Sequence, residues 1–173
     1  MSEARQTEIQ ETILDHVNRL GASDKVSATF TRAATTTAYT AGDVVGTDPA
    51  TNITFSGLTA GPFIILGARL RKDVNAIPSG LSSFRLHLYT SAPTAITDNL
   101  AYNLIAADRA KYLGYIVISN AIDLGDTVWL QSDETNFSGE ATTTSIIGVL
   151  QTVGAWTPAA STVYTISLDI ASV

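Results

Sequence analysis

The hydrophobic period of the sequence changes once, after Gly21, and this change constrains the fold more than any other feature. Over residues 3–20 apolar side chains recur every three or four positions, whereas the apolar runs downstream alternate with a period of two. The first period is typical of an amphipathic helix, and the second of strands with one buried face. The sequence therefore predicts an N-terminal helical arm, residues 1–21, joined to a β-sandwich domain, residues 22–173.

The arm presents one apolar stripe along its predicted helix. Its members are Ile9, Ile13, Leu14, Val17 and Leu20. An isolated helix of this length is marginal in water, so the stripe has to be buried on something. Packing on its own domain and packing between subunits or on a partner both remain open. The abrupt change in composition after Gly21 favours the second, and we predict that the stripe is an interface with other copies or with a partner.

Short strands punctuated by turn residues fill the rest of the chain. Residues 84–89 and 164–170 alternate most clearly, with Phe84, Leu86 and Leu88 on one face and Arg85, His87 and Tyr89 on the other. Further strands are predicted at 26–30, 44–45, 52–55, 63–70, 115–118, 127–131 and 145–150. Residues 98–111 are expected to form a crossover with one or two helical turns. The predicted fold class is all-β, an antiparallel β-sandwich or jelly roll with an N-terminal amphipathic α-helix.

Composition excludes several classes of function. The net charge is −6 and the pI about 4.7, so a polyanion such as nucleic acid is repelled on average. The absence of cysteine excludes disulfides, thiolate nucleophiles and zinc–thiolate sites. No apolar run approaches the roughly 20 residues that span a bilayer, and the polar N-terminus does not resemble a signal peptide. We expect no nucleic-acid or membrane partner, and synthesis in the cytoplasm.

No motif in the sequence indicates catalysis. The two histidines, His16 and His87, lie near no nucleophile or metal motif, and most acids lie at turns, where Asp is common for backbone reasons. A calcium site is conceivable at Asp123, Asp126, Asp133 and Glu134. These acids lack the usual Asp-x-Asp-x-Asp-Gly spacing, so solvated loop acids are the favoured interpretation. We expect a protein without enzymatic activity, cofactor or metal.

The two tryptophans and several other aromatic residues offer a second possibility. Phe137 in a polar stretch and Trp156 in the 154–158 loop are predicted to be exposed contact residues, whereas Trp129 in an alternating run is predicted to be core. Exposed loop aromatics indicate a contact surface for protein or glycan.

Several stretches resemble small virion proteins of tailed bacteriophages, in particular head auxiliary proteins of the decoration, cement or head-fibre kind. The likeness covers most of the chain after residue 26, and its motifs are FTRAATTTAYTAGDVV at 30–45, LHLY at 86–89, AP at 92–93, DN at 98–99, YLG at 112–114 and YTISL at 164–168. Ala33 departs from the pattern, because Pro is expected after the arginine. The resemblance carries over no catalytic residues.

This resemblance implies a structural subunit that binds the outside of a phage head. Repeated binding to a capsid favours an oligomer, and a trimer matches local three-fold positions, so the implied partners are further copies of the chain, as a homotrimer, and the major capsid protein. The arm then trimerises the subunit or anchors it to the shell. The alternative is a carbohydrate-binding or adhesin module of a phage fibre. A hydrolase with two paired acids on a sandwich is a third possibility.

Overall fold

The computed structural model describes residues 5, 10, 23–48 and 52–173. The apolar stripe of the predicted arm lies outside the described residues. The proposed roles of Ile9, Ile13, Leu14, Val17 and Leu20 therefore stay predictions.

Nine strands and one short 3-10 helix make up the described part of the chain. They are β1 (Ser23–Thr31), β2 (Val44–Val45), β3 (Ile53–Ser56), β4 (Gly61–Lys72), β5 (Phe84–Tyr89), η1 (Ala106–Lys111), β6 (Tyr112–Asp123), β7 (Val128–Ala141), β8 (Ser145–Thr152) and β9 (Val163–Ser172). Each predicted strand coincides with one of these, and η1 supplies the helical turn expected in the 98–111 crossover. The alternation and the turn residues thus locate every strand, although several strands extend further than expected.

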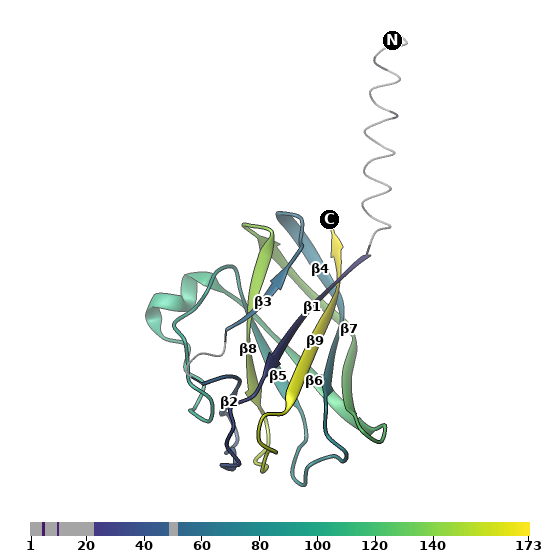
Figure 1. Ribbon diagram of the computed structural model, residues 1–173. Coiled ribbons are helices and arrows are strands. Elements are labelled where there is room, and N and C mark those ends of the chain that lie inside the picture. The colour runs from purple at the N-terminus through teal and green to yellow at the C-terminus, as the bar shows by residue number, and fades with distance from the viewer. Residues whose placement is uncertain (1–4, 6–9, 11–22, 49–51) are drawn as a thin grey trace.

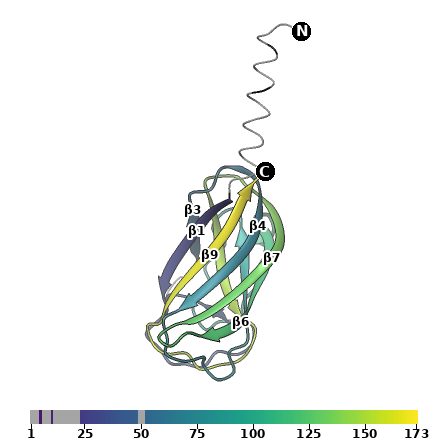
Figure 2. The same ribbon diagram turned by 90° about the vertical axis from the view of Figure 1, so that its right-hand side faces the viewer.

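The strands form one curled antiparallel sheet that folds over into two layers. Its order is β1-β9-β4-β7-β6-β5-β8-β2, with β3 also paired to β8. β6 turns the corner, because residues 112–118 pair with β5 and residues 119–123 pair with β7. Figure 2 shows β1, β9, β4 and β7 side by side in one layer. The edge strand of this layer, β1, contacts β3, which belongs to the other layer. The structure confirms the predicted β-sandwich or jelly-roll class.

The main core lies between the two layers and uses the inward residues of the alternating strands. Tyr164, Ile166, Leu168 and Ile170 of β9 are each at most 3% exposed. Burying a side chain of this size contributes about 1.5–3 kcal/mol to stability. Packing is tight at Gly148 of β8, where an added Cβ would come within 2.9 Å of side-chain atoms of two facing core residues.

A second, smaller core lies outside the layer that contains β5 and β8. Val44, Tyr89, Ile147 and Val149 form it. The connection between β5 and β6 covers this face, and Figure 1 shows its helix η1 outside β8. His87 and Tyr89, predicted on the strand face opposite to Phe84, Leu86 and Leu88, are therefore buried as well, at 5% and 2% exposed. Both do point away from the main core, as the alternation predicts, but a second layer of chain buries them.

Candidate functional site

Trp156, predicted as an exposed contact residue, is buried at one end of the sandwich. It is 3% exposed and forms an isolated β-bridge with Tyr39, whose ring centroid lies 5.1 Å from its own. Its indole Nε1 donates a hydrogen bond of 2.9 Å to Thr152 Oγ1. The connection between β8 and β9 folds back under the end of the sandwich opposite the C-terminus (Figure 1). The loop position is right, but the expected exposure of Trp156 is wrong.

Phe137, predicted to lie in a polar loop, lies in strand β7 opposite Ile65 of β4. Its ring is half-buried and packs over Gly114 of β6. A Cβ at Gly114 would lie 2.9 Å from Phe137 Cε2, and the φ of this glycine is +133°, so both the space and the backbone require glycine here. Phe137 is thus a packing residue of the sheet, and the predicted loop is wrong.

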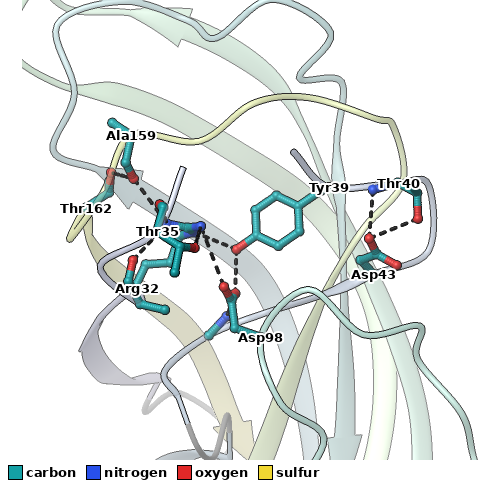
Figure 3. A network of polar contacts seen from close by, with 10 residues as sticks. Arg32, Thr35, Tyr39, Thr40, Asp43, Asp98, Ala159 and Thr162 are labelled. Carbon is teal, nitrogen blue, oxygen red and sulfur yellow. Dashed lines mark hydrogen bonds and ion pairs between the residues drawn. The ribbon is translucent and has the colours of Figure 1, made fainter. Parts of the chain in front are cut away.

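A network of polar side chains is buried beside Trp156. Arg32 Nε donates to the Tyr39 hydroxyl at 2.6 Å, and that hydroxyl donates to Asp98 Oδ1 at 2.5 Å (Figure 3). The charged groups of Arg32 and Asp98 lie 3.6 Å apart, and their side chains are 0% and 3% exposed. Burial and the bond to Asp98 raise the pKa of Tyr39, so its hydroxyl stays protonated.

Backbone groups complete this network and tie three distant segments together. Arg32 Nη1 donates to the carbonyl oxygens of Ala33, Thr35 and Ala159. Asp98 Oδ1 also accepts from the backbone N–H of Gly46 at 3.0 Å. The network therefore joins the segment after β1, the start of the crossover and the loop before β9. Because Arg32 and Asp98 have this many partners, both buried charges are compensated, and the network holds the three segments together.

His87 centres a second polar group, within the smaller core. Its Nδ1 lies 3.0 Å from the Tyr112 hydroxyl and its Nε2 lies 3.0 Å from Gln151 Oε1. Because the Gln151 oxygen only accepts, the imidazole proton lies on Nε2, and Nδ1 accepts from Tyr112. Tyr102 of the crossover stacks on the imidazole with centroids 3.7 Å apart. Burial lowers the pKa of His87 to about 4, so the ring is a neutral packing element.

The outer face of the layer β1-β9-β4-β7 carries a hollow of about 230 Å³. Its lining residues are Lys25, Ser27, Arg69, Arg71, Trp129, Thr165 and Ser167. Trp129 is half-buried and faces outward beside this hollow, so the prediction that it belongs to the core is wrong. Sequence alternation places Trp129 on one face of β7 but does not say which face is buried. We call this hollow the outer groove.

Three of the four acids predicted as a possible calcium site, Asp123, Asp126 and Asp133, are exposed, and the side chain of Glu134 lies outside the described part of the structure. Asp123 Oδ1 accepts from the backbone N–H of Gly125 at 2.9 Å, and Asp133 accepts from Gln131 Nε2 at 3.0 Å. Within residues 23–48 and 52–173, no three His, Asp or Glu side chains gather as a metal site would require. In the same part of the chain, no helix has the length and apolar character needed to cross a bilayer.

Comparisons with known proteins give structural likeness but no family. No family model matches the sequence, and no curated protein matches it. Among solved structures, one match is a chain in the X-ray structure of Tomato Aspermy Virus, with TM-score 0.32, 10% identity, and coverage of 95% of this chain and 94% of that chain. Another is in the structure of Triatoma Virus, with TM-score 0.26, 11% identity, and coverage of 88% and 64%. A third is a family two carbohydrate esterase from Cellvibrio japonicus, with TM-score 0.19, 12% identity, and coverage of 83% and 34%.

Proposed function

We propose that this chain is a non-enzymatic structural subunit of a phage virion, which binds the exterior of the head as a decoration or cement protein. The proposal rests on one observation: the stretches that resemble phage head proteins supply the residues of the buried network. The resembling stretches at 30–45 and 98–99 contribute Arg32, Tyr39 and Asp98, which bond to one another at one end of the sandwich. The shared residues are thus those that fix the shape of a rigid subunit.

The physical properties of the domain suit this role. A head protein has to stay folded while it is bound to a repeating surface, and the buried charges of Arg32 and Asp98 are compensated by each other and by backbone groups. Binding to many equivalent sites gains from linked copies, because the second contact is made at high effective concentration. We therefore propose a homotrimer that is assembled or anchored through the arm, with the major capsid protein as its partner.

The test measures oligomeric mass and particle binding of the full chain. Light scattering after gel filtration is expected to give a trimer, and the protein is expected to co-sediment with phage heads. The combined variant Ile9→Glu and Ile13→Glu disrupts the predicted stripe, whereas Gln10→Glu adds a charge at an exposed arm position as the matched control. The stripe variant should lose assembly or head binding while its near-ultraviolet circular dichroism, which reports the Tyr and Trp side chains of the sandwich, stays that of the wild type.

Three results would contradict the proposal. A strictly monomeric wild type that does not bind heads would remove the oligomeric cement role. A stripe variant that assembles and decorates like Gln10→Glu would remove the role of the arm. Turnover of any substrate by the purified chain would contradict the non-enzymatic assignment.

The alternative, a carbohydrate-binding or adhesin module, has to rest on a different surface from the one that the sequence indicates. Trp156 lies in the core and Phe137 packs over Gly114, so the two do not form an exposed aromatic patch. The outer groove is the specific feature that still favours this alternative, because it presents Trp129 among polar side chains.

A further inference from the structure

The outer groove is built from three rungs of residues that cross four neighbouring strands. In the middle rung, Ser27 of β1, Ser167 of β9, Arg69 of β4 and Gln131 of β7 lie side by side in register. The next rung places Thr29, Thr165, Arg71 and Trp129 side by side in the same way. All of these positions point away from the main core. The groove is therefore held by continuous backbone pairing and not by mobile loops.

The third rung borders the groove and contributes one of its lining residues, Lys25. It consists of Lys25, Asp169, Gly67 and Asp133, so the position on β4 has no side chain. Between Ile65 and Gly67 the pairing of β4 also shifts, by one residue against β9 and by two residues against β7, as in a β-bulge. Arg69 reaches Asp169 beside this gap and forms an ion pair with it. The Asp169 carboxylate lies over Gly67, where an added Cβ would be 3.4 Å from Asp169 Oδ2, and it borders the groove without lining it.

The lining of the groove has a distinct chemistry. It contains three cations, three hydroxyl groups and one indole, while the carboxylates of Asp169 and Asp133 border the groove and Asp169 pairs with Arg69. This is unusual for a chain of net charge −6 with ten basic residues, two of which, Arg32 and Lys72, are buried in the core. Within the described residues, the ammonium of Lys25 makes no ion pair within 4.0 Å, although Asp169 lies directly across from it. The groove therefore favours a ligand that carries negative charge and many hydrogen-bonding groups.

The size of the groove and its single aromatic side chain narrow the class of ligand. Its volume of about 230 Å³ is below the roughly 300–1,000 Å³ of pockets for drug-sized ligands, which suits one ring of a larger molecule. Single-stranded nucleic acid is usually bound by several aromatic side chains in succession, whereas Trp129 is the one aromatic residue of this lining. A polyanion would also meet the overall negative charge of the protein. A sugar ring with one carboxylate meets neither objection.

We propose that the outer groove binds an acidic saccharide, a sugar ring that bears a carboxylate. The apolar C–H face of the ring stacks on the Trp129 indole, and the carboxylate pairs with Arg71 or Lys25. Ser27, Thr165 and Ser167 exchange hydrogen bonds with the ring hydroxyls. Arg71 is suited to this pairing because its side chain is 45% exposed; its present ion-pair partner, Asp73, lies 3.1 Å away just after β4 and is itself exposed. The proposal concerns a different surface from the arm and does not depend on the proposed function.

The test titrates the full-length protein with defined sugars and follows the two indole N–H signals by NMR. The acidic probes are 3′-sialyllactose and digalacturonate, and the neutral counterpart is lactose. We expect the acidic probes to shift the Trp129 signal, with lactose binding at least about tenfold more weakly. The signal of the buried Trp156 is the internal reference and should not move.

Variants, titrated by isothermal titration calorimetry because Trp129→Ala removes the indole signal, assign the binding to the groove. Trp129→Ala and Arg71→Gln should each weaken binding of the acidic probe at least about tenfold, because they remove the stacking surface and the pairing cation. Arg109→Gln, at an exposed position on η1, is the matched control and should bind like the wild type. Thermal melting checks that each variant is folded.

Four outcomes would overturn the proposal. They are no binding of either acidic probe, equal affinity for lactose, unchanged affinity in the folded Trp129→Ala variant, and tighter binding of a thymidine hexanucleotide or a hexaglutamate peptide than of the sugars. Because these measurements use neither phage heads nor the oligomeric mass, their failure leaves the decoration proposal untouched, and the reverse also holds.

Discussion

The amine nitrogen of Lys72 lies 3.9 Å from the centroid of the Trp156 ring, and it has no hydrogen-bond partner among the described residues. The rings of Tyr164 and Phe84 lie 5.4 and 6.0 Å from the same atom. Lys72 is 1% exposed, and burial, helped by the positive charge of Arg32, lowers its pKa to about 7. The ring faces favour the ammonium form, yet they replace only part of its lost hydration.

This arrangement predicts that stability rises with pH between about 7 and 9.5. In the unfolded chain the pKa of Lys72 is 10.5, and in the folded chain it is about 7. Between these values the unfolded state holds more protons, so the free energy of unfolding increases with pH. Below about pH 7 both states are protonated and the cost of burying the charge is complete. Urea denaturation at a series of pH values measures this slope.

The variant Lys72→Met tests the origin of the slope. It removes the charge and keeps an unbranched side chain, so it should be more stable than the wild type at pH 7 by about 1–4 kcal/mol and should flatten the slope. Lys25→Met, at an exposed position, is the matched control and should keep the slope of the wild type. Identical slopes for the wild type and Lys72→Met would show that Lys72 does not titrate in this range.

The buried network predicts a large difference between two acidic positions. Asp98→Ala leaves the charge of Arg32 without its counter-ion and should cost about 3–5 kcal/mol of stability. Tyr39→Phe removes one hydroxyl that both charged groups contact, and should cost about 1–3 kcal/mol. Asp126→Ala, at an exposed turn, is the control and should stay within about 0.5 kcal/mol of the wild type. Chemical denaturation of the three variants gives the comparison. Equal losses at Asp98 and Asp126 would mean that the network adds nothing to stability.

Strand positions could be predicted from the sequence because they depend on local pattern. The alternation in residues 84–89 and 164–170 follows from the pleat of a strand with one buried face, and the turn residues between the runs set their ends. The length of β7 is the main error in the predicted strand boundaries. Its second half, around Phe137, is rich in Thr, Asn, Ser and Gly, which are typical of loops, and it becomes a strand because β4 pairs with it.

The residues of the candidate sites could not be predicted in the same way, because distant segments decide their burial. Tyr39 and Trp156 look like loop residues, but they cap the end of the sandwich together. Asp98 looks like a turn acid until Arg32, 66 positions earlier, is brought to it. Trp129 lies in an alternating run, and only the strand order shows that its side faces outward. Local period gives the two faces of a strand but not which one a second layer will cover.

Close packing at Gly148 predicts that even one methyl group is too large there. A Cβ at this position would lie 2.9 Å from Leu86 Cδ1 and 2.9 Å from Phe55 Cε2. Gly148→Ala should therefore cost about 1–3 kcal/mol through displacement of these core residues. Thr142→Ala, at an exposed position before β8, is the control and should have little effect. Thermal unfolding compares the two variants. A Gly148→Ala protein as stable as the wild type would show that the two facing side chains relax freely.

The His87 group predicts a second pH dependence, in an acid range separate from that of Lys72. The pKa of His87 is 6.5 in the unfolded chain and about 4 in the folded chain, so the unfolded state holds more protons between these values. Stability contributed by the neutral imidazole is therefore lost as pH falls from about 6.5 to 4. Because Tyr102 stacks on this ring, the crossover should loosen first, which amide hydrogen exchange of residues 90–111 at pH 7 and pH 4.5 would detect. His87→Gln should lose the dependence that is specific to the crossover, with exchange in β9 as the internal control. An equal loss of protection in both regions of the wild type, after correction for the slower intrinsic exchange at pH 4.5, would instead indicate global unfolding and contradict a local role for His87.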